Sequence, residues 1–257
     1  MAGRHPHKYE EMLPEELWAE MARAPIVYLA IGPLENHGPH NALGMDALRP
    51  YEASLRAAAI AGGIVFPPLY VGPAGAPAWS RTQLRNAGRR AYPPSVFVSR
   101  EVCALLYEEM LETLADLGFR VCMAFGGHAP VATLLREIAG RLGERVGEMR
   151  IWVGGEGDFD LASVADEDTG TRVMDHGGRY ETSMLMAHRA ELVDLDCFWG
   201  SCPAGEVDRD RWQLSDPHHL EGARVELGER YLDLMAREMA DIAKGMLASP
   251  GLLADAD

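Results

Sequence analysis

The sequence lacks a long apolar run, and this absence excludes one class of protein. A transmembrane helix needs roughly 18 or more consecutive apolar residues, and the chain of 257 residues contains no such stretch. The first residues carry Arg4 and Lys8 without the apolar segment that follows the basic start of a secretory signal. We therefore expect a protein that is neither membrane-spanning nor secreted, located in the cytoplasm.

Cysteine is also scarce. The four cysteines, Cys103, Cys122, Cys197 and Cys202, are too few and too irregularly spaced for a disulfide framework or a four-thiolate zinc site. Cys197 and Cys202 are close enough in sequence for a redox pair, but buried or free thiols are the simpler interpretation. This usage fits a reducing compartment.

Positive charge is in deficit, with 24 Lys and Arg against 39 Asp and Glu and a formal net charge of −15. Nucleic acids and anionic membranes recruit basic surfaces, so we expect neither as a partner and expect a small-molecule substrate instead. The balance of 47% hydrophobic and 25% charged residues is that of an ordinary globular protein. At this length we expect one domain over residues 1–257.

Several catalytic signatures are missing. The chain has neither the Gly-x-Gly-x-x-Gly of dinucleotide-binding folds nor the glycine-rich phosphate loop that ends in Gly-Lys-Ser/Thr. It also lacks the Gly-x-Ser-x-Gly turn that presents a serine nucleophile. Nucleotide-dependent chemistry and serine hydrolysis are therefore disfavoured.

What the chain does have is an alternation of short apolar runs and helical stretches, which predicts an α/β fold with a mostly parallel sheet covered by helices on both faces. The apolar runs, typical of buried strands, are Ala24–Gly32, Gly63–Val71, Phe119–Phe125 and Met149–Val153. The stretches with helical periodicity are Arg49–Ala61, Val98–Leu117, Val131–Leu142 and Gly228–Leu247. We expect the last helix to pack on the outside or at a subunit contact.

Metal-ligating side chains gather where the predicted strands end. Glu35 and His37 follow the first strand, and alternation in an extended segment puts both on one side. A Gly-Pro turn then lets the chain return Asp46 toward them. His128 follows two glycines after the third strand, and a further cluster spans Asp175–Ser183. Since ligands bind at the carboxyl edge of parallel sheets, we expect these residues to form one site.

Each of these residues also has a simpler interpretation. A lone His or Glu near a strand end is usually a solvated loop residue or a cap, and Thr182 and Ser183 could cap a helix over Met184–His188. The pair His218 and His219 fits an exposed loop better than a ligand set. It is the joint occurrence of three glycine-bounded clusters that favours a metal site.

Mixed imidazole and carboxylate ligands suit zinc, manganese or ferrous iron. Two such ions sharing one carboxylate would activate a water molecule near neutral pH and polarise a carbonyl group. Asp46 is the candidate for the shared carboxylate. The predicted cofactor is therefore a divalent metal, with one or two ions per chain.

These motifs resemble those of the creatininase (creatinine amidohydrolase) family. The segment from Glu35 to Asp46 is similar to that family's Glu-x-His-Gly-x-His…Asp signature, and Gly127-His128 falls where the family has Asn-Gly-His. The block Asp175–Met186 resembles the family's His-Gly-Gly-x-x-Glu-Thr-Ser motif. The resemblance extends in order from Ile26 to Leu247.

The resemblance implies a three-layer α/β/α fold, a binuclear metal site and hydrolysis of amide-like C–N bonds in small, often cyclic, molecules. It also implies a homo-oligomer, frequently a hexamer. By this resemblance, Glu35, Asp46 and His128 would hold one metal, and His37 and Asp46 the other. His176 would carry a proton to the leaving group. Glu181 would either complete the second metal site or orient His176.

The chain departs from the family at several positions. Creatininase has an acidic ligand of the second metal two residues after the histidine of Asn-Gly-His, where this chain has Pro130. Creatininase has an aromatic residue four positions before the counterpart of His176, where this chain has Arg172. The family's Pro-Gly-Thr-x-Ser-Leu segment is missing, and Ala91–Val96 stands near its place. Creatinine itself is therefore not the expected substrate.

The expected activity is hydrolysis of an amide-like bond in a small polar substrate. A guanidinium binds carboxylates and polyols well, so the arginines of the segment 71–94 could contact substrate, although a solvated basic loop explains them equally well. Two alternatives stay open: ring opening of a keto-inositol or lactone-like compound, and a non-catalytic metal-binding protein of the same fold. Those arginines are Arg81, Arg85, Arg89 and Arg90.

Overall fold

The computed structural model describes residues 5–75, 94–165, 176–200 and 220–249. Within these ranges a five-stranded sheet has the order β2-β1-β3-β5-β4. Its neighbouring strands run parallel except for the terminal β4–β5 pair. The strands are β1 (Ile26–Ile31), β2 (Ile64–Val65), β3 (Val121–Gly126), β4 (Arg145–Val146) and β5 (Met149–Gly154).

Three of the four predicted strands are present over most of their length. The fourth, expected over Gly63–Val71, is reduced to the two residues of β2. Pro67 and Pro68 follow it at once, and because proline has no N–H to donate to a ladder, it ends regular pairing. A single bridge from Ile31 to Leu69 continues the contact with β1.

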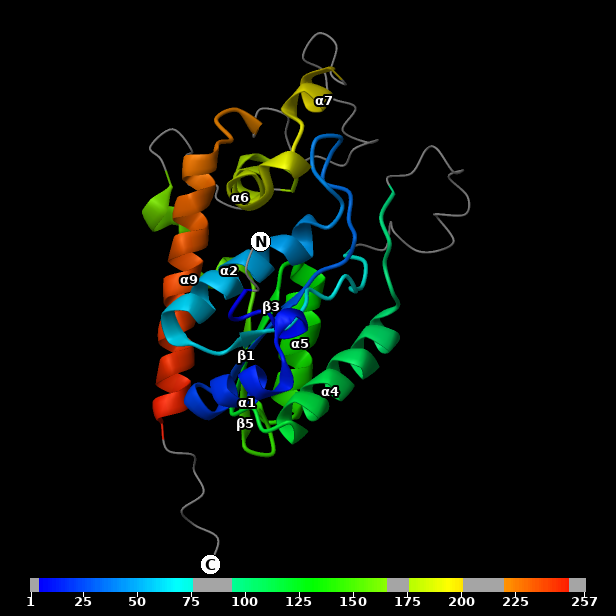
Figure 1. The fold of residues 1–257 in the computed structure, drawn as a ribbon. Coiled ribbons are helices and arrows are strands. Elements are labelled where there is room, and N and C mark those ends of the chain that lie inside the picture. The colour runs from blue at the N-terminus through cyan, green and yellow to red at the C-terminus, as the bar shows by residue number, and fades with distance from the viewer. Residues whose placement is uncertain (1–4, 76–93, 166–175, 201–219, 250–257) are drawn as a thin grey trace, which may run out of the picture.

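Helices cover both faces of the sheet (Figure 1). All six residues of β1 are buried, and they alternate between two apolar layers. Ile26, Tyr28 and Ala30 pack in the core formed with α2, α6 and α9, and the intervening residues pack against α4 and α5. This arrangement confirms the predicted three-layer α/β/α fold with a mostly parallel central sheet.

The helices supply these outer layers. The α-helices are α1 (Pro14–Arg23), α2 (Met45–Ala61), α4 (Arg100–Asp116), α5 (Ala129–Arg141), α6 (Arg179–Arg189), α7 (Leu195–Gly200) and α9 (Val225–Ala248). Short 3-10 helices span Tyr9–Glu11, Glu156–Asp158, Leu161–Val164 and Ala190–Leu192. Within the described ranges, each helix is too short or too polar to span a lipid bilayer.

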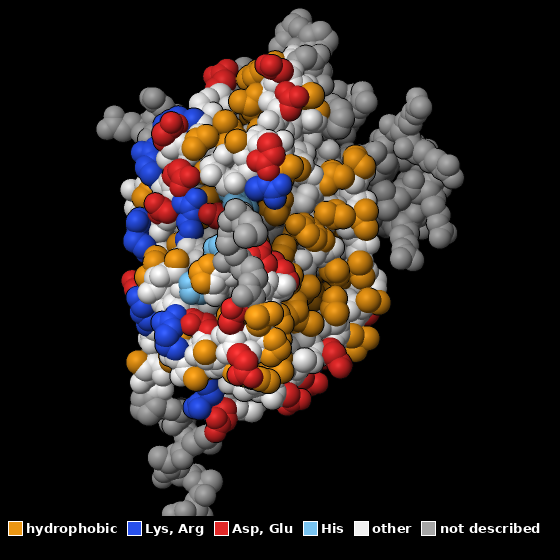
Figure 2. All heavy atoms as spheres, in the orientation of Figure 1, with side chains coloured by type: hydrophobic (Ala, Val, Ile, Leu, Met, Phe, Trp, Pro, Cys, Tyr) orange, Lys and Arg blue, Asp and Glu red, His pale blue; other side chains and the backbone are white. Residues whose placement is uncertain are grey.

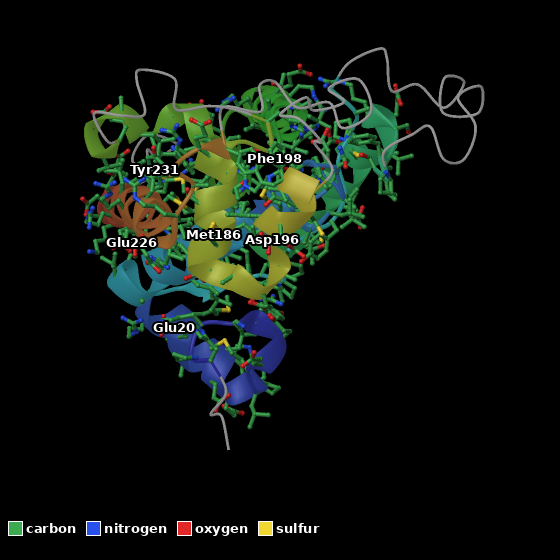
Figure 3. The ribbon with its side chains drawn as sticks, turned by 90° about the horizontal axis from the view of Figure 1, so that it is seen from above. Glu20, Met186, Asp196, Phe198, Glu226 and Tyr231 are labelled. Carbon is green, nitrogen blue, oxygen red and sulfur yellow. The ribbon has the colours of Figure 1, made fainter. Side chains whose placement is uncertain are left out.

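The last helix, α9, is part of the chain's own core. Leu232, Met235 and Met239 are buried in the layer that it shares with α2 and α6. Seen from above, α6 with Met186 lies between α7 and α9, which carries Tyr231 (Figure 3). The apolar stripe, expected on the outside or at a subunit contact, is therefore covered by intramolecular packing.

Candidate metal centre

Three of the predicted ligands follow the carboxyl ends of two neighbouring strands. β1 and β3 pair in parallel from Ile26 with Val121 to Ile31 with Gly126, so they end level with each other. Glu35 and His37 follow β1, and His128 is the N-cap residue of α5 directly after β3. This is the edge at which open parallel sheets bind ligands.

Asp46 reaches this edge from the first turn of α2. That helix begins at Met45 rather than at Arg49, the start expected from periodicity, so Asp46 is held by a helix and not by a returning loop. The preceding turn does contain Gly38 with φ +85°, a conformation that favours glycine. Asp46 is 1% exposed, which fixes its carboxylate within the protein.

Two glycines let the start of α2 approach the strand ends this closely. A Cβ atom on Gly127 would lie 1.8 Å from the Asp46 carbonyl oxygen, and one on Gly32 would lie 2.5 Å from the Asp46 carbonyl carbon. Both contacts involve backbone atoms, which cannot rotate away as a side chain can. The glycine of Gly127-His128 is therefore a condition for placing Asp46 beside His128.

We expect Gly127→Ala to lower the free energy of unfolding by about 1–3 kcal/mol, the usual effect of forcing atoms into a packed site, and to weaken metal binding. Urea denaturation and metal titration of the variant measure both effects. Gly140→Ala is the matched control, because no atom lies within 4 Å of its added Cβ. Alanine is favoured over glycine in a helix by about 1 kcal/mol, so this variant should not lose stability. Equal stability of Gly127→Ala and wild type would contradict the steric argument.

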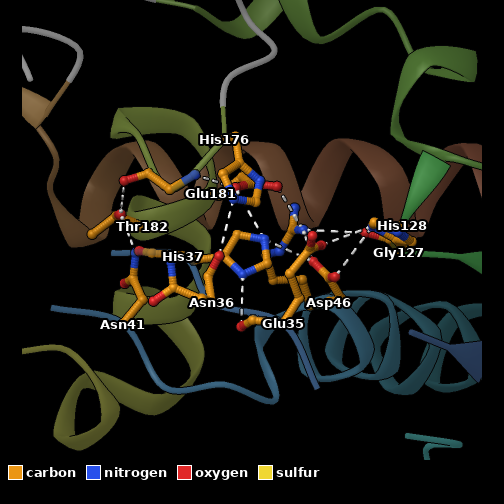
Figure 4. Close-up of polar contacts among 12 residues, drawn as sticks. Glu35, Asn36, His37, Asn41, Asp46, Gly127, His128, His176, Glu181 and Thr182 are labelled. Atoms are coloured by element: carbon orange, nitrogen blue, oxygen red, sulfur yellow. Dashed lines mark hydrogen bonds and ion pairs between the residues drawn. The ribbon is translucent and has the colours of Figure 1, made fainter. Parts of the chain in front are cut away.

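Among the described residues there are three groups of candidate metal ligands, with ligand atoms within 4.8 Å of one another in each group, and Glu35, Asp46 and His128 form the first. His128 Nδ1 lies 2.9 Å from Glu35 Oε2 and 3.5 Å from Asp46 Oδ2 (Figure 4). Both carboxylate oxygens are buried and accept no hydrogen bond from the described residues. Buried carboxylate oxygens are costly unless a cation faces them, either a protonated imidazole such as His128 or a bound metal ion, so this group fits a metal ion.

His37, Asp46 and Glu181 form the second group. His37 Nε2 lies 3.0 Å from Asp46 Oδ1 and 3.6 Å from Glu181 Oε2. Asp46 thus has one oxygen in each group, as a bridging carboxylate would. Glu181 Oε2 also accepts a hydrogen bond of 2.7 Å from the Gly177 N–H.

His176 lies beside this second group. Its ring centroid is 4.4 Å from that of His37, and its Nε2 donates to the Asn36 carbonyl at 3.0 Å. Together with Glu35 and His37 it makes up the third ligand group. All six predicted site residues are therefore brought together, and the geometry alone allows His176 to act either as a ligand or as a proton carrier.

Buried hydrogen bonds hold the His176 segment over the end of β1. His40 Nε2 contacts the Gly177 carbonyl at 3.0 Å, and Asn41 Nδ2 donates to the His37 carbonyl at 3.1 Å. Asn41 also donates to Thr182 Oγ1 at 2.9 Å. Thr182 lies inside α6, which begins at Arg179, so the alternative interpretation, in which Thr182 and Ser183 cap a helix over Met184–His188, is wrong.

Sequence reasoning missed two charged residues of the site, Arg49 and Glu156. Arg49 is 1% exposed and forms ion pairs with Asp46, Glu181 and Glu156. Glu156 follows β5 after Gly154 and Gly155. The missed signal was this Gly-Gly-Glu at the end of a third parallel strand, where the glycines repeat the pattern seen before His128.

Burial and charge shift the pKa values of the cluster in opposite directions. Burial alone would lower the pKa of His37, but Asp46 and Glu181 outweigh it and raise the value to about 10. Burial would likewise lower the pKa of His128, which Glu35 and Asp46 raise instead. Burial opposes ionisation of Asp46, yet His37 and Arg49 hold its pKa well below the usual range. Without a metal, protons on imidazoles balance the carboxylates.

We expect metal binding to release protons near pH 6, because a ligating histidine must be neutral. Glu35 and Asp46 raise the pKa of His128 against the effect of burial, which favours its protonated form there, and the ring gives up this proton when it binds the ion. The affinity for the metal ion therefore rises as the pH increases through the pKa of His128. Calorimetric titration in buffers of different ionisation enthalpy measures the release, and binding with no proton release near pH 6 would contradict a metal on His128.

Several predicted features lie elsewhere or outside the described residues. Pro130 stands in the first turn of α5 and supplies no ligand atom. Cys103 and Cys122 are buried free thiols, and Cys197 is exposed with its Sγ 3.2 Å from Asp194 Oδ2. Cys202, Arg172, the segment 76–93 with its four arginines, and the pair His218 and His219 lie outside the described residues.

Comparison with known proteins decides the family. The family model described as creatininase, creatinine amidohydrolase, matches residues 10–243. The chain belongs to the creatininase family. This confirms the family indicated by the sequence motifs and, with it, the class of enzyme, a hydrolase.

Members of the creatininase family with known sequences or structures resemble the chain over most of its length. It is 25% identical over 234 residues to creatinine amidohydrolase of Pseudomonas putida, covering 84% of this chain and 87% of the relative. A solved structure named creatininase Mn has a TM-score of 0.67 at 23% identity and covers 94% of this chain and 99% of its own. A creatininase variant complexed with creatine has a TM-score of 0.70 at 22% identity, with coverage of 94% and 99%. The manganese form agrees with the predicted divalent cofactor.

Proposed function

We propose that this creatininase-family protein is a metal-dependent hydrolase that cleaves an amide-like C–N bond in a small polar substrate, with cyclic amides as the first candidates. The observation that carries the proposal is the pair of buried carboxylate oxygens, Glu35 Oε2 and Asp46 Oδ2, that converge on the His128 ring and accept no hydrogen bond from any other described residue. The relatives described as creatinine amidohydrolases support the bond type. The departures at Pro130 and Arg172 argue against creatinine as substrate.

Glu35, Asp46 and His128 would hold the metal. Asp46 would also offer its other oxygen, with His37, to a second metal position. When bound, a divalent ion supplies Lewis acidity, which lowers the pKa of water and polarises a carbonyl group. The chain's own task is to orient the ligands. His37 is oriented by its Nδ1, which donates to the Glu35 carbonyl at 3.1 Å, so that Nε2 faces the carboxylates.

His176 is the proposed proton carrier to the leaving nitrogen. Its Nε2 is held by the Asn36 carbonyl, so Nδ1 is the ring atom that would exchange the proton. Such transfer by a positioned imidazole is typical of general acid–base catalysis. Glu181 contacts His37 and Arg49, which favours its role in the second ligand group over a role in orienting His176.

A substrate panel tests the proposed reaction. The manganese-loaded and zinc-loaded protein is assayed with cyclic amides, formamides and keto-inositols, and Asp46→Ala serves as the blank for contaminating activity. Turnover of an amide by the wild-type protein, but not by the Asp46→Ala blank, supports the proposal. Turnover of a keto-inositol alone would overturn the C–N specificity in favour of ring opening, and no turnover of any compound would favour a non-catalytic metal protein.

We also propose a homo-oligomer, which the family resemblance implies. Apolar side chains gather over α4 and the segment before it (Figure 2), where Val96, Val102 and Leu105 are exposed. Exposed apolar patches of this kind mark association surfaces.

We expect Leu105→Glu to shift the protein toward monomer, because it places a charge in this patch. Light scattering after size-exclusion chromatography measures the mass. Ile60→Glu, a change at an exposed residue of α2, is the control and should leave the mass unchanged. A monomeric wild type would contradict the proposal.

A further inference from the structure

Arg49 is a buried cation inside the candidate metal centre. It lies on the second turn of α2, one turn after Asp46, and 1% of its side chain is exposed. Its Nη2 donates to Asp46 Oδ1 at 3.2 Å and to Glu181 Oε1 at 2.8 Å. Its Nη1 pairs with Glu156 on the far side. The guanidinium is permanently charged, so this positive charge is present whether or not a metal is bound.

Because of Arg49, the two main ligand groups are unequal. In the first group, Glu35 Oε2 and Asp46 Oδ2 are buried and accept no hydrogen bond from the described residues. In the second group, Asp46 Oδ1 and Glu181 Oε1 already accept from Arg49, and Glu181 Oε2 accepts from the Gly177 N–H. The named oxygens of the first group thus face only the His128 ring, itself a candidate ligand, whereas each named oxygen of the second group already accepts a hydrogen bond from a fixed donor.

Charge repulsion from Arg49 also disfavours a metal ion in the second group. A divalent ion bound to Asp46 Oδ1 and Glu181 would share both carboxylates with the guanidinium and lie next to it. In a buried site this repulsion is weakly screened by solvent or salt. Arg49 donates to Asp46 Oδ1 and not to Oδ2, so an ion at Oδ2 would not share its ligand oxygen with the guanidinium.

We infer that Arg49 makes this a centre with one tightly bound metal ion: a divalent ion binds to Glu35, Asp46 and His128, and the guanidinium takes the place of the charge that a second ion would bring to the group of His37, Asp46 and Glu181. This inference rests on the proposed function and adds the number of ions and the residue that sets it. Arg49 is a positioning residue for the carboxylates in this scheme.

Metal titration of chelator-treated protein tests the inference without relying on activity. Calorimetry with Mn²⁺ should give one tight ion per chain for wild type. Arg49→Met removes the charge but keeps an apolar side chain, and it should bind a second ion at least tenfold more tightly than wild type does. Arg49→Lys keeps the charge and should behave as wild type. Arg56→Met is the matched control, since Arg56 lies on the same helix and also binds three carboxylates, Glu52, Glu229 and Asp233; it should still bind one ion.

Removing Arg49 leaves Glu156 without its partner, so Arg49→Met could fail to fold. The double variant Arg49→Met with Glu156→Gln removes both charges and should show the same second ion. Electron paramagnetic resonance of wild type needs no variant: one isolated Mn²⁺ is expected at saturation. Two equally tight, coupled ions in wild type would overturn the inference and leave the proposed hydrolase intact, whereas no bound metal would overturn both.

Discussion

Asp46→Ala is expected to lose the tightly bound metal and to lower kcat/KM by more than about 100-fold, the loss that even a residue behind the metal ligands can cause. The reason is geometric, because Asp46 faces His128 with Oδ2 and His37 with Oδ1. No other residue of the first two ligand groups belongs to both. Metal content by mass spectrometry and turnover of the accepted substrate measure the two effects.

The controls separate this loss from unfolding. Asp46→Asn keeps the shape of the side chain and removes its negative charge, so it should fold and still bind metal poorly. Asp233→Ala removes an exposed aspartate that also pairs with an arginine, Arg56, and should retain metal and activity. An Asp46→Ala protein with wild-type metal content would remove the basis of the proposed function.

The parts of the site that follow a buried strand could be predicted from the sequence. The run Ile26–Ile31 is apolar throughout, so its end, and with it Glu35 and His37, is recognisable without the structure. The same holds for His128 after β3. These residues are close in space because parallel strands end at one edge, which is a property of the topology and not of any single residue.

Arg49 could not be predicted in the same way, whereas Glu156 follows a predicted strand, β5, and carried the same signal as His128. Periodicity placed Arg49 at the first residue of its helix, whereas α2 begins at Met45, and a basic residue at a helix end looks like an ordinary solvated side chain. Its burial depends on three carboxylates that come from different segments, Asp46, Glu156 and Glu181. Periodicity reports which face of a helix is apolar, but it carries no information on such a long-range charge match.

The same limit explains the prediction for α9. Its stripe of Leu232, Met235 and Met239 showed that one face is buried, and this was correct. Whether that face packs within the chain or against another copy depends on the position of α2 and α6, which the sequence of α9 does not contain. The structure places the stripe in the layer shared with those helices.

His176→Ala is expected to keep its metal and to lose about 10²- to 10⁴-fold in kcat, the usual contribution of a positioned proton donor. The loss should be small for a substrate analogue whose leaving group departs without protonation, and added imidazole should restore part of the activity. A role as a metal ligand, which the group of Glu35, His37 and His176 also allows, would instead lower metal content and slow all substrates equally.

His188→Ala gives the matched control for this experiment. His188 lies in the last turn of α6 and pairs with Glu52 at 2.9 Å, outside all three ligand groups. Its removal should leave metal content and kcat unchanged. If His176→Ala keeps both its metal and its full activity on unactivated amides, the proton must reach the leaving nitrogen by another route, and the Asn36 carbonyl would then hold His176 for a structural reason only.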